Sequence, residues 1–130
     1  MGTLKSKIKK YIHNEKGSQA IEFVAMFPLI LLSILIIWQI GLIAFSLVVA
    51  ESAARDGARA AAIHDPNWSQ VAENSAFGLD VKVTGGPGIE EARVNVEVQA
   101  PIVQLPLISE IDFSYTLDAV MPMEEDPDED

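Results

Sequence analysis

The chain has 130 residues, of which 49% are hydrophobic, and a formal net charge of −10. This length allows at most one small domain plus a membrane segment. The acidic balance argues against nucleic acid as a partner, and the absence of cysteine excludes disulfides and thiolate metal sites.

Residues 1–17 are predicted to form a basic cytoplasmic leader. Five lysines stand against the single acid Glu15, and they are Lys5, Lys7, Lys9, Lys10 and Lys16. Positive charge beside a membrane segment stays on the cytoplasmic side. We therefore expect a single-pass membrane protein with its N-terminus in the cytoplasm and its C-terminal part outside the cytoplasm.

The run from Phe23 to Ala50 contains no charged side chain. As a helix it would span roughly 42 Å, more than the hydrocarbon core of about 30 Å. It is also longer than the apolar core of a removable secretory signal. We predict a transmembrane part at about 23–50, and we expect Pro28 to kink or loosen the helix there.

This helix is predicted to continue outside the membrane, so that it covers residues 18–64. Residues 50–62 are rich in alanine and other good helix formers. Asp65-Pro66 should end the helix, because proline disfavours a helical residue before it.

A small extracytoplasmic domain is predicted for residues 65–121. Asp65 is expected to cap a short helix that runs to about Phe77. Alternating sequence then predicts strands at 79–84, 92–98 and 111–120, with a turn at 85–88 and an irregular crossing at 101–109. The predicted fold is α+β: one long N-terminal transmembrane helix extending outside the membrane, a short helix and a small antiparallel β-sheet. The acidic tail, 122–130, is expected to be disordered.

Small residues recur at helical spacing in the outer part of the long helix. One row is Ser46, Ala50, Ala54, Ala58 and Ala62, and the other is Ala53, Gly57 and Ala61. Such rows let helices approach closely, which would suit packing against other subunits. Packing against the chain's own β-sheet explains them equally well, so both alternatives stay open.

The sequence contains no catalytic signature. His13 and His64 have no partnered nucleophile nearby, and the glycines at 85–88 lack the lysine of a nucleotide-binding loop. We therefore expect no enzyme activity, no catalytic, cofactor-binding or metal-ligating residues, and no small-molecule substrate.

The junction between leader and helix carries the most specific motif. Gly17 is followed by Ser18, three further residues, and then Glu22 and Phe23 at the start of the apolar run. This pattern resembles the processing site of type IV prepilins and pseudopilins. The amino-acid sequence from Gly17 to about Met121 is similar to that of the TadE-like minor pilins of tight-adherence (Flp-type) systems. Ser18 departs from the phenylalanine common at this position in type IVa prepilins.

The resemblance implies that a prepilin peptidase cuts after Gly17, where a glycine lets the protease approach the backbone closely. It also implies a location in the bacterial inner membrane, in contact with its lipid, with the C-terminal domain in the periplasm. The partners that it implies are a major Flp pilin and other minor pilins. Glu22 would then pair with the new amine of a neighbouring subunit, although a solvated Glu22 at headgroup level is the simpler alternative. A pseudopilin of another secretion system also fits. So does an unprocessed membrane anchor with a small extracytoplasmic binding domain.

Overall fold

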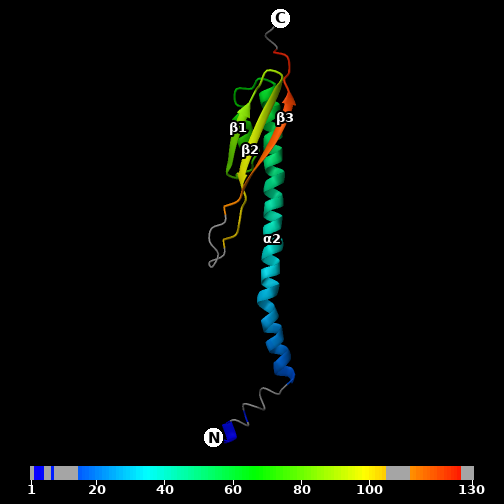
Figure 1. Ribbon diagram of the computed structural model, residues 1–130, viewed down its shortest axis with the longest axis vertical. Helices are drawn as coiled ribbons and strands as arrows, with labels where there is room; N and C mark the ends of the chain where they lie inside the picture. Colours follow the sequence, from blue (N-terminus) through cyan, green and yellow to red (C-terminus); the bar gives the residue numbers. More distant parts are fainter. Residues whose placement is uncertain (1, 5–6, 8–14, 105–111, 127–130) are drawn as a thin grey trace. The chain divides into compact units, whose positions relative to one another are not determined.

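The computed structural model describes residues 2–4, 7, 15–104 and 112–126. Its elements are α2 (Glu15–Ala62), α3 (Trp68–Asn74), β1 (Val81–Gly86), β2 (Glu91–Gln99) and β3 (Ser114–Pro122) (Figure 1). The predicted α+β fold, with a long N-terminal helix, a short helix and an antiparallel sheet, is confirmed. The chain divides into a helix unit, Met1–Trp38, and a sheet unit, Gln39–Asp130.

Helix α2 is continuous through Pro28, and the residues on both sides of it are helical. One polar side chain of this part is satisfied locally, because the Ser33 hydroxyl donates to the Leu29 carbonyl oxygen at 2.9 Å. Because its hydroxyl is already hydrogen-bonded within the helix, Ser33 suits an apolar surrounding.

The boundary between α2 and α3 differs from the prediction. Helix α2 ends at Ala62, and His64 takes a left-handed conformation with φ of 61°. Asp65 is not the N-cap of α3: that position belongs to Asn67, which makes no side-chain capping bond. The Asp65 carboxylate instead accepts the Asn67 backbone N–H at 2.8 Å. Helix α3 ends at Asn74, short of the predicted Phe77.

The three strands form one antiparallel sheet in the order β1-β2-β3. Strand β2 is central and alternates between buried and more accessible residues. Its buried side chains are Ala92, Val94, Val96 and Val98, all with no exposed surface. The prediction of period-two strands is therefore right in kind, with bounds shifted by one to three residues. Of the predicted crossing at 101–109, residues 101–104 have no regular structure, and 105–109 lie outside the described residues.

Two glycines assigned to a turn by the sequence belong to β1. Gly85 and Gly86 have positive φ of 102° and 131° and pair with Val94 and Arg93. A Cβ on Gly85 would lie 2.2 Å from the Arg93 carbonyl oxygen. The strand continues only because neither residue has a side chain.

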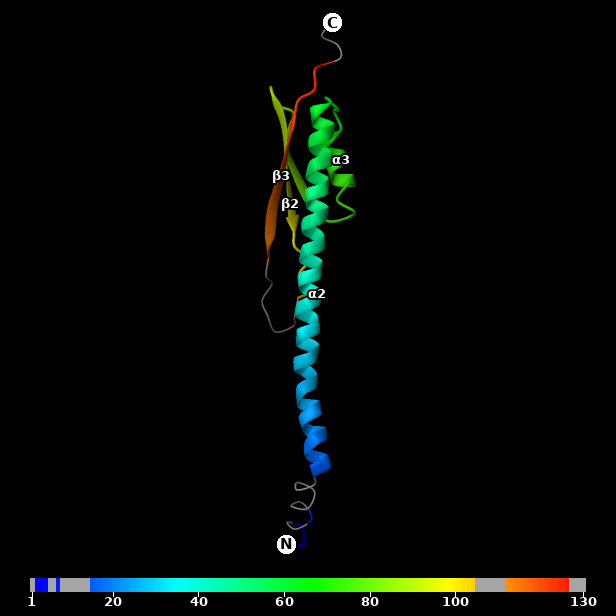
Figure 2. The same cartoon turned by 90° about the vertical axis from the view of Figure 1, so that its right-hand side faces the viewer.

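One face of the sheet is covered by the outer part of α2 and by α3 (Figure 2). The buried core joins the β2 valines to both small-residue rows of the helix. The helix contributes Val49, Ala50, Ala53, Ala54, Ala58, Ala61 and Ala62. Gly57 lies at the tightest point, where a Cβ would come within 2.8 Å of the Ala72 Cβ and 3.2 Å of a Val94 methyl. The structure thus favours the second alternative, packing against the chain's own sheet.

This burial corrects the C-terminal end of the predicted membrane part. Val49 and Ala50 are 5% and 0% exposed within the core of the sheet unit, and Ser46 is fully buried. Residues enclosed by the protein cannot face lipid, so the range 23–50 extends too far. Composition alone could not reveal this, because an apolar residue suits a bilayer and a protein core equally.

The beginning of the predicted acidic tail is bound to the domain. Pro122 is the last residue of β3. The Met123 N–H donates to the Glu90 carbonyl at 2.9 Å, and the Glu124 N–H donates to the Ala62 carbonyl at 3.0 Å. A carbonyl at the C-terminal end of α2 thereby gains a partner. Residues 127–130 of the predicted tail lie outside the described residues.

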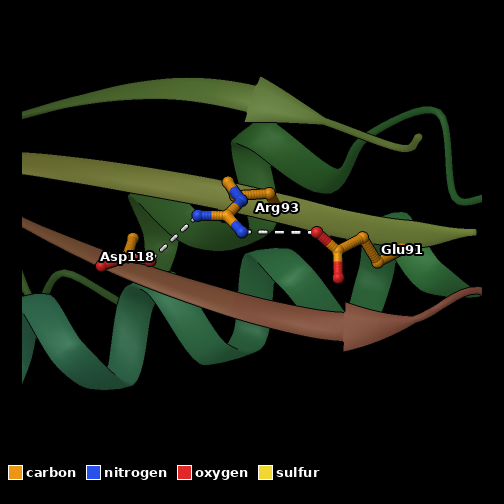
Figure 3. A network of polar contacts seen from close by, with 3 residues as sticks. All are labelled: Glu91, Arg93 and Asp118. Carbon is orange, nitrogen blue, oxygen red and sulfur yellow. Dashed lines mark hydrogen bonds and ion pairs between the residues drawn. The ribbon is translucent and has the colours of Figure 1, made fainter.

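The other face of the sheet is polar. Arg93 lies between Glu91 and Asp118, with nitrogen–oxygen distances of 3.3 and 3.6 Å (Figure 3). All three side chains are more than half exposed. Exposed pairs of this kind contribute little to stability, so we interpret this face as solvated.

Candidate processing and membrane site

The predicted cleavage bond, Gly17–Ser18, lies in the first turn of α2, which begins at Glu15. The first four backbone N–H groups of a helix have no carbonyl partner within it. This turn therefore opens at lower cost than the interior of the helix. Gly17 is partly accessible and Ser18 is exposed, so both residues of the bond can be approached.

Glu22 lies one helical turn beyond Ser18, and its side chain is exposed, as is that of Phe23. Within the described part of the chain, Glu22 has no hydrogen-bond or ion-pair partner. Its carboxylate is thus not engaged by the described residues of this chain. The negative charge near the N-terminal end of α2 is also favourable toward the helix dipole.

The surface beyond Glu22 is large and apolar. Many bulky side chains of the helix unit are exposed, among them Phe23, Val24, Phe27, Leu29, Ile34, Ile37 and Trp38. The candidate span lies in Gly17–Ala62, and the most apolar window of this helix has a mean hydropathy of 2.6 with none of it buried. A helix of this length and composition suggests a single-pass membrane protein.

The predicted helix-packing residues are brought together elsewhere. Ala50, Ala54, Ala58 and Ala61 are fully buried in the core of the sheet unit, and Gly57 touches β2 and α3. These residues therefore hold the domain together, whereas Gly17, Ser18, Glu22 and Phe23 belong to the accessible start of α2.

Two polar residues, Gln39 and Ser46, make hydrogen bonds in the sheet unit that the sequence did not predict. The Gln39 amide donates to the Pro101 carbonyl at 2.7 Å and accepts the Val103 N–H at 2.8 Å. The buried Ser46 hydroxyl bonds to the Tyr115 hydroxyl of β3. Their signal in the sequence is that each is a lone polar residue in an uncharged apolar run.

Comparison with known protein families finds a match over about a third of the chain. Residues 17–59 match the family model of TadE-like protein. The resemblance seen in the sequence is confirmed over this segment. No curated protein and no solved structure matches the chain.

The TadE-like match implies a role in a tight-adherence pilus system and an association with pilus components. It begins at Gly17, the residue before the predicted cut, and ends at Arg59 in the outer part of α2. TadE-like pilins are structural components of such systems. Among residues 2–4, 7, 15–104 and 112–126, no group of three or more His, Asp or Glu side chains could hold a metal ion.

Proposed function

We propose that this chain is a minor pilin or pseudopilin that assembles with a tight-adherence (Flp) pilus after a prepilin peptidase removes residues 1–17. The observation that carries the proposal is the start of the TadE-like match at Gly17 itself, directly after a basic leader. The leader would remain in the cytoplasm, the helix unit would cross the inner membrane, and the sheet unit would lie in the periplasm.

Cleavage requires an extended backbone at the Gly17–Ser18 bond, whereas this bond is helical in the precursor. Because the bond lies in the first turn, only that turn has to open for the peptidase to reach it. Glycine destabilises a helix more than any residue except proline, and its lack of a side chain leaves the backbone open to the protease. The local structure is therefore compatible with processing.

The cut would leave an amine on Ser18, one turn before Glu22. Holding an ionised glutamate at depth in a bilayer costs about 3 kcal/mol. A neighbouring subunit that brings its amine to Glu22 would offset this cost by neutralising both charges. The exposed and unpaired state of Glu22 in the described chain supports a partner outside the subunit: the amine of the major Flp pilin or of another minor pilin.

The processing step is tested by sequencing the N-terminus of the protein purified from its host membrane. We expect the chain to begin at Ser18, and Gly17→Leu to leave the precursor uncut. Gly41→Leu is the matched control, because Gly41 lies in the same helix with open space around it. An N-terminus at Met1 in the wild type would contradict processing and favour an unprocessed membrane anchor.

The assembly step is tested with Glu22→Ala, followed by counting pili on cells and by detecting the protein in sheared pili. We expect normal cleavage with a strong loss of pili. Glu51→Ala is the control, since it removes another exposed glutamate of α2 that already pairs with Arg55. Normal numbers of pili on Glu22→Ala cells would show that Glu22 has no role in assembly.

A further inference from the structure

The end of the sheet unit where α2 enters it has an unusual composition. We define the domain base as Gln39, Ile40, Phe45, Val103 and Phe113. Four of these are large apolar residues whose side chains are 43–61% exposed. They come from α2 and from both ends of the segment that joins β2 to β3.

Hydrogen bonds and an aromatic contact hold the parts of the base together. Gln39 binds the backbone of Pro101 and Val103 through both ends of its amide. The Ala100 N–H donates to the Phe113 carbonyl at 2.8 Å. The Phe113 and Tyr115 rings have centroids 6.1 Å apart, and the Tyr115 hydroxyl reaches Ser46 on α2. Val103 and Phe113 are therefore fixed beside the helix rather than free to fold inward.

The Gln39 contact limits how deep the base can lie in a membrane. Residues 101–104 have neither helical nor strand structure, and such backbone does not occur where it faces hydrocarbon. The bilayer core must then end before Gln39. A helical span from Ser18 to Trp38 measures roughly 30 Å, the thickness of the core.

The sequence carries no charge around Gln39, Ile40, Phe45 and Val103. No charged residue occurs in the sequence between Trp38 and Ala50, or from Ala100 to Ser109. Elsewhere the sequence of the sheet unit is strongly acidic. Asp112 is the charged neighbour of Phe113, and its side chain is exposed, a position that the headgroup region tolerates. An apolar domain base on an otherwise acidic domain suits contact with lipid rather than with water.

We propose that the domain base is a lipid-contacting surface that rests in the outer headgroup region of the inner membrane. Ile40, Phe45, Val103 and Phe113 then meet the boundary between headgroups and acyl chains, as interfacial aromatic and aliphatic residues do. Gln39 is the positioning residue, because it fixes the β2–β3 connection at this depth. The inference rests on the proposed membrane-spanning role of the helix unit.

The test uses the full chain in vesicles of phosphatidylethanolamine and phosphatidylglycerol. Since the natural chain has no cysteine, Val103→Cys and Phe113→Cys can each carry a single environment-sensitive fluorophore. We expect lipids with a shallow spin label to quench both fluorophores strongly, and aqueous iodide to quench them weakly. Ile89→Cys is the matched control, because Ile89 is fully exposed and lies away from the base. The next residue, Glu90, accepts the Met123 N–H, and Glu124 donates to Ala62 at the C-terminal end of α2.

Three outcomes would overturn the inference. Labels at Val103 and Phe113 that respond to iodide like the Ile89 label would show that the base lies in water. Labels shielded from both quenchers would show that protein covers the base. A label at Leu32→Cys that is quenched by neither shallow nor deep spin-labelled lipids would show that the helix does not insert. Both the proposed membrane role and the inference about the domain base would then be wrong. If lipids quench the Leu32 label in either of the first two outcomes, the proposed membrane role stands and only the inference about the domain base is wrong.

Discussion

Within α2, residues 21–38 and residues 46–62 differ in the size and burial of their side chains. The first segment exposes bulky residues such as Phe23, Phe27 and Trp38. The second buries alanines and a glycine against β2 and α3. The buried face of the second segment is apolar, as is nearly all of the first, so side-chain size distinguishes these surfaces. Small residues let the helix approach its own sheet, while large ones present area to an external partner.

The strongest way to break this comparison is to place a large residue in the buried segment. Gly57→Leu should destabilise the sheet unit by about 3 kcal/mol or more, because the new side chain meets Ala72 and Val94. Denaturant unfolding of the full chain in detergent measures the effect.

Gly41→Leu is the control for that change, since nothing lies within 4 Å of a Cβ at Gly41. It should be neutral or slightly stabilising, because leucine favours helix more than glycine does. Equal effects at Gly57 and Gly41 would contradict the view that close helix–sheet approach decides residue size in the second segment.

Gln39→Ala tests how the junction between the two segments is held in place. Loss of its two hydrogen bonds to the backbone should cost about 1 to 2 kcal/mol. Hydrogen exchange at the Val103 amide should accelerate while the β2 amides keep their relative protection.

Ser33→Ala is the matched control for this junction, because its hydroxyl bonds only within the helix. It should leave exchange in the sheet unit unchanged. An unchanged Val103 amide in Gln39→Ala would show that the loop is held by other contacts.

The smallest effect is expected on the outer face of the sheet. Arg93→Met should change the free energy of unfolding by about 0.5 kcal/mol or less, because both of its carboxylate partners are exposed. Thermal unfolding at low and high salt measures this change. A loss above about 1 kcal/mol would mean that this face is structural rather than solvated.

Much of the fold could be predicted from sequence because its signals are local. Lack of charge from Phe23 to Ala50 predicted the long helix, and alternation predicted the three strands. Errors arose where tertiary contacts override local preference. Asp65 has the residue type of an N-cap but binds the Asn67 N–H outside α3, and Gly85-Gly86 extends β1 because β2 pairs with it.

By itself, the sequence determined the α+β class, the basic leader and the Gly17–Glu22 motif, and the family match supports this reading of the motif. These features depend on residue type and spacing along one chain. Only the tertiary structure decided where the apolar run stops facing outward. A run of alanines and valines is compatible both with contact to lipid and with a protein core. The β2 valines that share a core with Val49 and Ala50 lie more than 40 residues away in the sequence.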